Sequence, residues 1–214
     1  MKENIANFID HTLLKPDAIL SDIKKLCSEA REYHFYSVCV NPCWVSVAKD
    51  LLKDSDVKVG AAVGFPLGAS TSAVKAFEAR DAIGNGAEEI DMVMNIGAAL
   101  ERRWDYVEDD IKGVVSAADG RCVKVIIETC LLSEEQIIAA CHAAEGAGAR
   151  FVKTSTGFNG GGATVEAVKV MHGAVSDDIG VKASGGIKDE KTALAMVEAG
   201  ATRLGTSSGI AIIQ

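Results

Sequence analysis

Charged side chains interrupt several short apolar stretches of the sequence that are otherwise typical of buried β-strands. Lys153 lies within FVKTS, Lys182 within VKAS and Asp91 within EIDMVMN. Burying an unpaired charge is costly, so aliphatic residues would serve stability better at these positions. The residue types suit carbonyl chemistry, because a neutral lysine amine forms a Schiff base with a carbonyl and a carboxylate can transfer protons.

Other strand-like stretches hold polar residues of the same kind: Asp10 in IDHT, Cys39 in VCVN and Lys124 in VKVIIE. Side chains alternate between the two faces of a strand, so Asp91, Lys153 and Lys182 each point away from their apolar neighbours. In a closed barrel of strands they would meet in one polar layer. In the Asp10-His11-Thr12 stretch, the same alternation predicts that His11 faces the opposite side from Asp10.

Two lysines on neighbouring strands disfavour each other's charged form, and burial adds to this effect. At least one amine is therefore expected to be neutral near physiological pH, while Asp91 keeps the other lysine protonated. By pattern alone, Lys182 rivals Lys153 as the nucleophile. The alternative for the whole set is a buried network of salt bridges that only fixes packing.

These polar positions fall on a regular alternation of strand-like and helical patterns along the chain. Ser133 and Gln136 form a capping box at one helix start, and Asp189 can cap another. The predicted strands cover residues 8–13, 36–40, 57–64, 89–94, 123–128, 151–155, 180–183 and 203–205. The predicted helices cover residues 17–34, 41–53, 72–85, 100–118, 133–146, 163–175 and 189–199.

Eight alternating units favour a (β/α)₈ TIM barrel of the α/β class over a doubly wound open sheet. No segment differs enough in composition to form a second domain, so residues 1–214 are expected to form a single domain. Polar residues at the C-terminal ends of successive strands also suit a barrel. We expect an N-terminal helix and a final helix that is short or missing, since the chain stops at Gln214.

Glycine- and serine-rich loops follow the last three predicted strands and could bind a phosphate through backbone N–H groups. The predicted phosphate-binding residues are Gly157, Gly185, Gly186, Gly205, Ser207 and Ser208. The substrate is therefore expected to be a small phosphorylated carbonyl compound. Neither GxGxxG nor a P-loop motif occurs and no cluster has metal-ligand spacing, so we expect no cofactor and no metal.

Composition limits the partners and the compartment. The net charge of −8, without any basic run, argues against nucleic acid or an anionic membrane surface. No apolar run approaches the roughly 18–20 residues of a membrane span, and the N-terminus has no signal-peptide pattern. Six cysteines without CxxC pairs are typical of a reduced, cytoplasmic protein.

The motifs FIDHTLL, SVCVNP, VGFPLG, EEIDMVMNIG, KVIIET, FVKTSTGF, GVKASGGI and GTSSGI occur in order, one at each predicted strand. Together they resemble the deoxyribose-phosphate aldolases over almost the whole chain. The resemblance implies a (β/α)₈ barrel that cleaves 2-deoxy-D-ribose 5-phosphate reversibly to D-glyceraldehyde 3-phosphate and acetaldehyde, without a metal. Two alternatives stay open: a sugar-phosphate lyase or isomerase that uses its lysines only as acids and bases, and a catalytically inactive sugar-phosphate-binding barrel.

The resemblance also implies roles for individual residues. Lys153 would form the Schiff base, and Asp91 and Lys182 would donate and accept protons. The implied substrate-binding residues are Lys124, Cys39, Asp10 and Thr156. From the residues alone, Cys39 is more typical of a small buried apolar side chain and Asp10 of a group that orients the network. The short C-terminus further suggests a homo-oligomer, dimer or tetramer, in which a partner covers part of the barrel wall.

Overall fold

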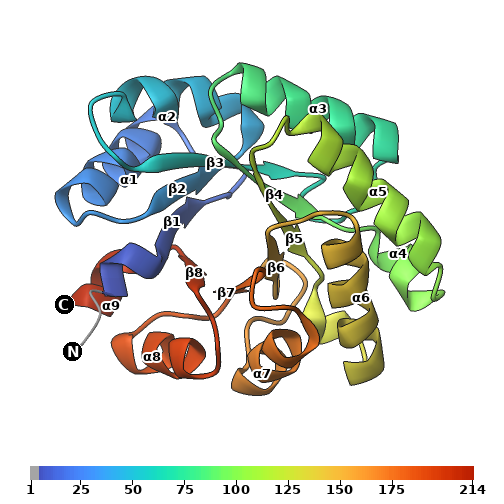
Figure 1. The fold of residues 1–214 in the computed structure, drawn as a ribbon. Helices are drawn as coiled ribbons and strands as arrows, with labels where there is room; N and C mark the ends of the chain where they lie inside the picture. Colours follow the sequence, from blue (N-terminus) through green and yellow to red (C-terminus); the bar gives the residue numbers. More distant parts are fainter. Residues whose placement is uncertain (1–4) are drawn as a thin grey trace.

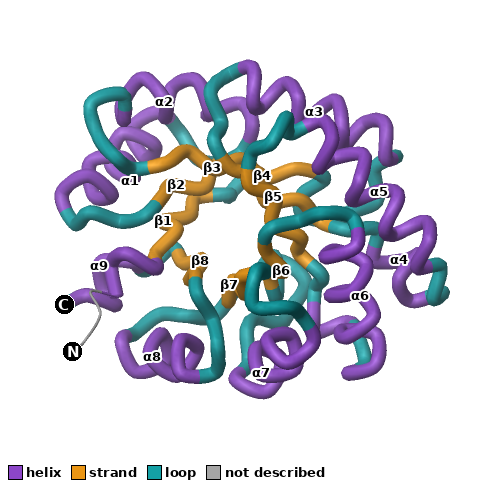
Figure 2. The backbone as a smooth tube through the Cα atoms, viewed as in Figure 1, coloured by secondary structure: helices purple, strands orange, loops and turns teal. Residues whose placement is uncertain are grey.

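The computed structural model describes residues 5–214, which form one closed barrel of eight parallel strands surrounded by helices (Figure 1). Each strand pairs with the next along the chain, and β8 pairs with β1 to close the ring (Figure 2). The strands are β1 (Ile9–Leu13), β2 (Ser37–Val40), β3 (Lys58–Val63), β4 (Glu89–Val93), β5 (Cys122–Ile126), β6 (Phe151–Lys153), β7 (Gly180–Ser184) and β8 (Arg203–Thr206). The predicted TIM barrel is confirmed.

Helices follow the strands and form the outer layer of the barrel (Figure 1). The α-helices are α1 (Leu20–Glu32), α2 (Val45–Leu52), α3 (Ser72–Gly84), α4 (Ile96–Leu100), α5 (Trp104–Ala117), α6 (Glu134–Gly146), α7 (Val165–Ala174), α8 (Glu190–Glu198) and α9 (Gly209–Ile213). Three 3₁₀ helices accompany them: η1 (Ile5–Phe8), η2 (Pro42–Trp44) and η3 (Thr129–Leu131). The last helix is short, as predicted, and before β1 the described chain forms only the 3₁₀ turn η1.

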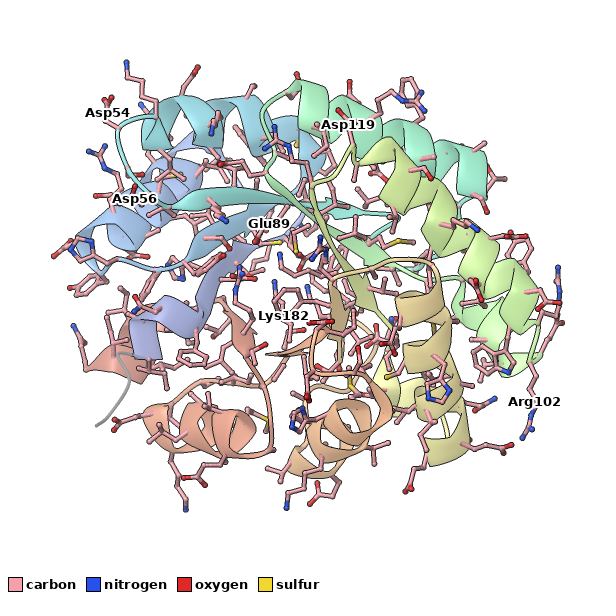
Figure 3. All side chains as sticks on the ribbon, in the orientation of Figure 1. Asp54, Asp56, Glu89, Arg102, Asp119 and Lys182 are labelled. Atoms are coloured by element: carbon pink, nitrogen blue, oxygen red, sulfur yellow. The ribbon has the colours of Figure 1, made fainter. Side chains whose placement is uncertain are left out.

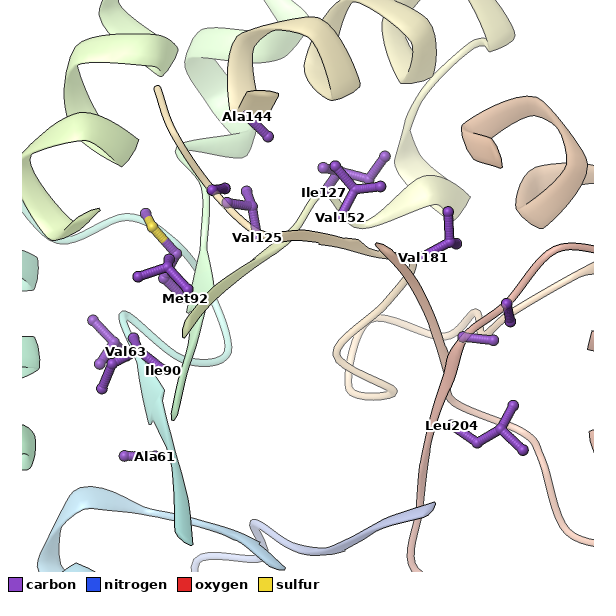
Figure 4. Close-up of a cluster of buried hydrophobic side chains, with 14 of the residues drawn as sticks. Ala61, Val63, Ile90, Met92, Val125, Ile127, Ala144, Val152, Val181 and Leu204 are labelled. Atoms are coloured by element: carbon purple, nitrogen blue, oxygen red, sulfur yellow. The ribbon is translucent and has the colours of Figure 1, made fainter. Parts of the chain in front are cut away.

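The two faces of the strands differ in chemistry. The outward-facing side chains are aliphatic, and Ile90, Met92, Val125, Val152 and Val181 pack between the strands and the helices (Figure 4). Each of them is essentially inaccessible to solvent. This layer is the main hydrophobic core, so burial of apolar surface on the outside of the ring stabilises the barrel. The inside is left free for polar groups.

Local sequence signals account for most helix starts. The Ser133 hydroxyl accepts from Gln136 N at 3.3 Å, and the Gln136 side chain accepts from Ser133 N at 3.0 Å, which completes the predicted capping box. Asp189 caps α8 by accepting from Thr192 N at 2.8 Å. These contacts satisfy backbone N–H groups that have no partner inside the helix.

Several predicted boundaries were wrong, and two of them have a clear cause in the local backbone. The helix expected over 100–118 is two helices, because Asn95 caps a separate α4 by accepting from Ala98 N at 2.9 Å. Arg102 then has a φ of 59°, which ends that helix before α5 begins. The strand expected over 123–128 ends at Ile126, since Glu128 has left-handed backbone geometry with φ 57°. A strand cannot continue through that conformation.

The predicted domain 1–214 begins outside the described residues, which form a single barrel from Ile5 onwards. Among the helices of residues 5–214, none combines the length and apolar character that a bilayer span requires.

The outer layer contains one buried ion pair. Lys75 of α3 and Asp110 of α5 lie 2.6 Å apart between Nζ and Oδ2, and both side chains are fully buried. The two helices run side by side (Figure 1). Asp110 Oδ1 has no hydrogen-bond partner among the described residues. Burial lowers the pKa of Lys75, and the hydrogen bond to Asp110 opposes this shift only partly. The pair is therefore a costly way to join two helices.

We predict that Lys75→Met lowers the free energy of unfolding by about 3–5 kcal/mol, because it leaves the Asp110 carboxylate buried without a counter-ion. The double variant Lys75→Met/Asp110→Leu should recover much of that loss, since it removes both charges and keeps their volume. Urea unfolding of the wild type, both single variants and the double variant measures the coupling. Additive losses in the double variant would contradict the prediction.

Candidate active site

The interior of the barrel holds a network of charged side chains instead of an aliphatic core. Figure 3 shows Glu89 and Lys182 at the centre of the ring, whereas Asp54, Asp56 and Asp119 lie at the periphery. All members of the network are at least 96% buried. They comprise three carboxylates and four cationic groups: Asp10, Glu89, Asp91, Lys124, Lys153, Lys182 and Arg203.

Asp91 lies at the middle of this network. Its Oδ2 accepts hydrogen bonds from Lys153 Nζ at 2.7 Å and from Lys182 Nζ at 2.7 Å. Its Oδ1 accepts from Lys124 Nζ at 2.9 Å. Lys153 and Lys182 are paired residues of neighbouring strands β6 and β7, which explains why one carboxylate oxygen reaches both. The predicted convergence of Asp91, Lys153 and Lys182 is confirmed.

A second carboxylate connects the network to the seam of the barrel. Asp10 on β1 accepts hydrogen bonds from Lys182 on β7 and from Nε of Arg203 on β8, the latter at 2.8 Å. The Ser37 hydroxyl donates to the same carboxylate at 2.7 Å. Every oxygen of Asp10 is therefore occupied by protein groups. These contacts suit a group that orients the network, and that role of Asp10 stays a prediction.

Glu89 and Arg203 were missed by the sequence analysis. Glu89 accepts from Lys124 Nζ at 2.6 Å and from Arg203 Nη2 at 2.9 Å. The Arg203 guanidinium also lies over the Tyr36 ring, 3.6 Å from its centroid. Both residues open their predicted strands, 89–94 and 203–205, and only charged residues further inside the strands were assigned to the polar layer. Their spacing of two from Asp91 and Gly205 would have placed them on the inward face.

The charges stabilise one another. Burial alone would raise the pKa values of Asp91 and Asp10, but Lys124 and Lys182 outweigh it and hold both pKa values below the ordinary range. Burial would lower the pKa of Lys182, but Asp10 and Asp91 raise it above its ordinary value. The pKa of Lys124 is raised for the same reason. Asp91 is therefore an ionised acceptor between protonated lysines.

This result corrects part of the expectation about Lys182. From the sequence, mutual repulsion is expected to favour a neutral amine on at least one of the two lysines. In the structure, Asp91 Oδ2 lies between Lys153 Nζ and Lys182 Nζ, so attraction to Asp10 and Asp91 outweighs the repulsion at Lys182 and raises its pKa. The two carboxylates therefore favour the protonated form of Lys182.

A cavity of about 370 Å³ opens above the network at the C-terminal ends of the strands. Lys153 is the member of the network that lines this cavity. The predicted Thr156 also lies in the wall, together with the whole predicted glycine–serine set: Gly157, Gly185, Gly186, Gly205, Ser207 and Ser208. The lysine and the loops that sequence patterns assigned to one site are thus brought together.

Three predicted substrate-binding residues lie below this cavity, outside its lining. Asp10 and Lys124 are occupied by the network, and Cys39 is buried against Leu14 and Ala62. Burial raises the pKa of the Cys39 thiol to about 11, so it behaves as a small apolar side chain. As predicted, His11 faces away from Asp10, and its Nε2 lies 2.8 Å from a Glu29 oxygen.

Two further cations line the cavity and were missed by the sequence analysis. Lys15 follows β1 and Lys188 follows β7, and both lie in the wall with the glycine loops. Phe158 of the loop after β6 also lines the cavity and packs edge-on against Phe65, with ring centroids 5.1 Å apart. The cavity thus has a cationic, glycine-rich side and an aromatic side. Lysines after a strand are too common in loops for sequence alone to single these out.

The comparison with known proteins decides the family. The family model described as DeoC/LacD family aldolase matches residues 5–214. The chain belongs to this aldolase family. The resemblance seen in the eight motifs is therefore confirmed.

Relatives in this aldolase family match nearly the whole chain. Deoxyribose-phosphate aldolase from Bdellovibrio bacteriovorus is 62% identical over 210 residues, covering 98% of this chain and 96% of its own length. Deoxyribose-phosphate aldolase 1 from Bacillus licheniformis is 59% identical over 215 residues, covering 100% and 96%. A tetrameric structure of deoxyribose phosphate aldolase from Aeropyrum pernix has a TM-score of 0.92 at 33% identity, covering 98% of this chain and 89% of that one.

Several acidic groups lie close together inside the barrel of this DeoC/LacD family aldolase. Within residues 5–214, no group of three or more His, Cys, Asp and Glu side chains is arranged to hold a metal ion. The network carboxylates point to lysine and arginine partners instead. The absence of a metal and of a cofactor stays a prediction.

We predict that the free energy of unfolding of this aldolase falls as the pH drops below about 4. The pKa values of Asp10 and Asp91 are held below the ordinary 3.8 in the folded state, so the unfolded chain takes up protons first. Each such group contributes up to about 1.4 kcal/mol per pH unit in this window. Urea unfolding at a series of pH values measures the slope, which should be shallower in Asp10→Asn. A flat profile between about pH 5 and pH 3 would contradict this prediction.

Proposed function

We propose that this chain is a deoxyribose-phosphate aldolase that cleaves 2-deoxy-D-ribose 5-phosphate to D-glyceraldehyde 3-phosphate and acetaldehyde through a Schiff base. One observation carries the proposal. Lys153 lines the cavity, and its Nζ shares an Asp91 oxygen with Lys182 Nζ, so an amine that can act as a nucleophile lies next to a fixed proton donor and acceptor. The names of the relatives that match nearly the whole chain support the substrate.

Lys153 suits the role of nucleophile because a carbonyl in the cavity can reach its amine. The network has three carboxylates against four cationic groups, so it can release one proton and become balanced. The neutral amine attacks the aldehyde carbon of the open-chain sugar, and the carbinolamine loses water to give the imine. Lys182, held protonated beside Asp91, supplies the proton that the departing water needs.

In the cleavage of the carbon–carbon bond, the Asp91–Lys182 pair accepts a proton instead of donating one. The protonated imine draws the electron pair of the C2–C3 bond, the C3 hydroxyl loses its proton to the Asp91–Lys182 pair, and glyceraldehyde 3-phosphate leaves. The two-carbon enamine on Lys153 is then protonated at C2 and hydrolysed to acetaldehyde. Electrostatic stabilisation is strong here because the network is buried and preorganised.

The glycine–serine side of the cavity supports phosphate binding at the other end of the substrate. The backbone at Gly185 and Gly186 has positive φ values of 88° and 80°, which turns the loop after β7 into a tight cradle. The Ser208 N–H donates to Thr206 Oγ1 at 2.9 Å, so α9 starts directly at the cavity. Lys15 and Lys188 supply charge to this wall. Loops after strands seven and eight of such barrels commonly bind phosphate.

We predict that sodium borohydride with acetaldehyde attaches a two-carbon adduct to Lys153, because reduction converts the imine to a stable amine. Peptide mass spectrometry should find the adduct on the peptide that holds Lys153. Lys153→Leu should remove both the adduct and the cleavage of deoxyribose 5-phosphate. The matched control is Lys188→Met, which removes a cavity lysine outside the network and should leave adduct formation intact.

Three results would overturn or redirect this proposal. Cleavage without any adduct would favour a lyase or isomerase that uses its lysines only as acids and bases. Absence of turnover on deoxyribose 5-phosphate would favour the inactive binding barrel. Treatment with EDTA should leave cleavage intact, and its loss would reveal a metal requirement.

We also propose that the protein is a homo-oligomer in the cytoplasm. On helix α3, the charged Lys75 is buried, whereas two apolar side chains are exposed: Phe77 is 66% and Val74 is 52% exposed. An exposed apolar surface of this kind suits contact with a second copy. The tetramer described for the Aeropyrum pernix relative supports the same proposal. The six free thiols are consistent with a reducing compartment.

We predict that light scattering gives the mass of a dimer or tetramer for the wild type. Phe77→Lys should shift the protein towards the monomer, because it places a charge in the proposed contact. The control Lys112→Ala, on the exposed side of α5, should not change the mass. A wild type that is monomeric at micromolar concentration would contradict the proposal.

A further inference from the structure

Glu128, just past the end of β5, is a buried carboxylate that the proposed mechanism does not use. Its side chain is inaccessible to solvent, and its backbone lies in the left-handed region with φ 57° and ψ 62°. Residues other than glycine rarely adopt this conformation, and such strain persists where the surrounding contacts enforce it. The conformation turns the side chain of Glu128 towards the loop that follows β6.

The Glu128 carboxylate accepts its shortest hydrogen bonds from that loop. Oε1 accepts from Thr156 N at 3.2 Å, and Oε2 accepts from Thr156 Oγ1 at 2.5 Å and from Asn159 Nδ2 at 2.7 Å. Thr156 Oγ1 in turn accepts from Phe158 N at 3.0 Å. One carboxylate thus fixes three successive wall residues of the cavity, Thr156, Gly157 and Phe158.

The charge of Glu128 is not balanced by a cation. None of the ion pairs found within residues 5–214 includes it. A carboxylate only accepts hydrogen bonds, which matches a site made of donors, whereas a glutamine would set an NH₂ group against them. Because a buried unpaired charge opposes folding, stability alone does not explain the residue. Its hydrogen bonds indicate that Glu128 holds the loop after β6 in place.

The glycines of the same loop allow the close packing that this arrangement needs. A side chain at Gly161 would overlap the Cβ of Cys130, and one at Gly162 would overlap the carbonyl oxygen of Gly185. Ala163 N donates to that Gly185 oxygen at 3.0 Å. The stretch without side chains after Asn159 is therefore clamped between η3 and the loop after β7. Glu128 fixes the start of this segment and Gly185 fixes its end.

We propose that Glu128 is a positioning residue that sets the affinity for the phosphorylated end of the substrate, by holding the Thr156–Phe158 segment in the cavity wall. The inference rests on the proposed aldolase function, since it assigns the phosphate to the wall that this segment helps to form. Among the described residues, Glu128 makes no hydrogen bond or ion pair with Lys153 or Asp91, so it acts outside the reacting groups. Its effect should therefore be on binding and not on the amine.

The test compares a phosphorylated substrate with one that has no phosphate. In Glu128→Gln, the KM for deoxyribose 5-phosphate should rise about tenfold, because a donor now faces Thr156 Oγ1 and Asn159. Borohydride trapping of acetaldehyde on Lys153 should keep the wild-type rate within about twofold. The matched control is Glu135→Gln, which changes an exposed glutamate of α6 that pairs with Arg102, and it should change neither value.

Asn159→Ala keeps the experiment decisive if the Glu128 variant does not fold. It removes one donor from a half-buried position, so the KM should rise severalfold, and much less when Glu128 is already glutamine. An unchanged KM in a folded Glu128→Gln variant, or in Asn159→Ala, overturns the inference. Equal losses in trapping and in KM overturn it too, because Glu128 would then act on Lys153. A wild type that forms the adduct but does not cleave the sugar phosphate refutes the proposed substrate instead.

Discussion

The structure depends on one shared anion, the Asp91 carboxylate, which accepts hydrogen bonds from three lysines inside a closed ring of strands. Three ammonium groups could not be buried together without it, because desolvation and repulsion would both oppose them. The remaining carboxylates, Asp10 and Glu89, extend the same compensation towards Arg203. The interior is therefore held together by ion pairs and hydrogen bonds. The hydrophobic stabilisation of the barrel comes from the aliphatic layer outside the strands.

The separation of an aliphatic outer layer from a charged interior explains how the barrel can hold the Lys153 amine beside the cavity. The outward layer excludes water from the sheet, while the inward network fixes Lys153 at the floor of the cavity. The substrate would have its carbonyl at that floor and its phosphate among the glycines above. Both ends of the site are built on strand ends and the loops after them, so their separation is set by the rigid sheet.

Sequence patterns predicted the fold well because the signals are periodic and local. All eight strands follow from short strand-like runs that alternate with helical patterns along the chain, and the convergence of Asp91, Lys153 and Lys182 follows from alternation within strands. Glu89 and Arg203 were placed at the first positions of predicted strands, but they were missed because only charges further inside the strands were assigned to the polar layer. The separate α4 was missed because its cap at Asn95 and its end at Arg102 depend on two single backbone conformations.

The role of Glu128 could not be predicted for a different reason. Its partners lie in another βα unit, and its left-handed backbone gives no signal in the types of neighbouring residues. The raised pKa of Lys182 was likewise hidden, since it depends on a carboxylate from β1 that is distant in the chain. Contacts between units, rather than patterns within them, decide these properties.

The seam where β8 meets β1 has a consequence for folding. Asp10 and Arg203 are separated by almost the whole chain, yet their contact completes the charge network of the interior. Such a distant contact forms only after the loop entropy of the intervening chain has been overcome, which is typically a late event. Until then, Lys182 lacks one of its two carboxylate partners. The site is thus assembled by ring closure itself, so catalytic competence and the docking of the last strand should appear together during refolding.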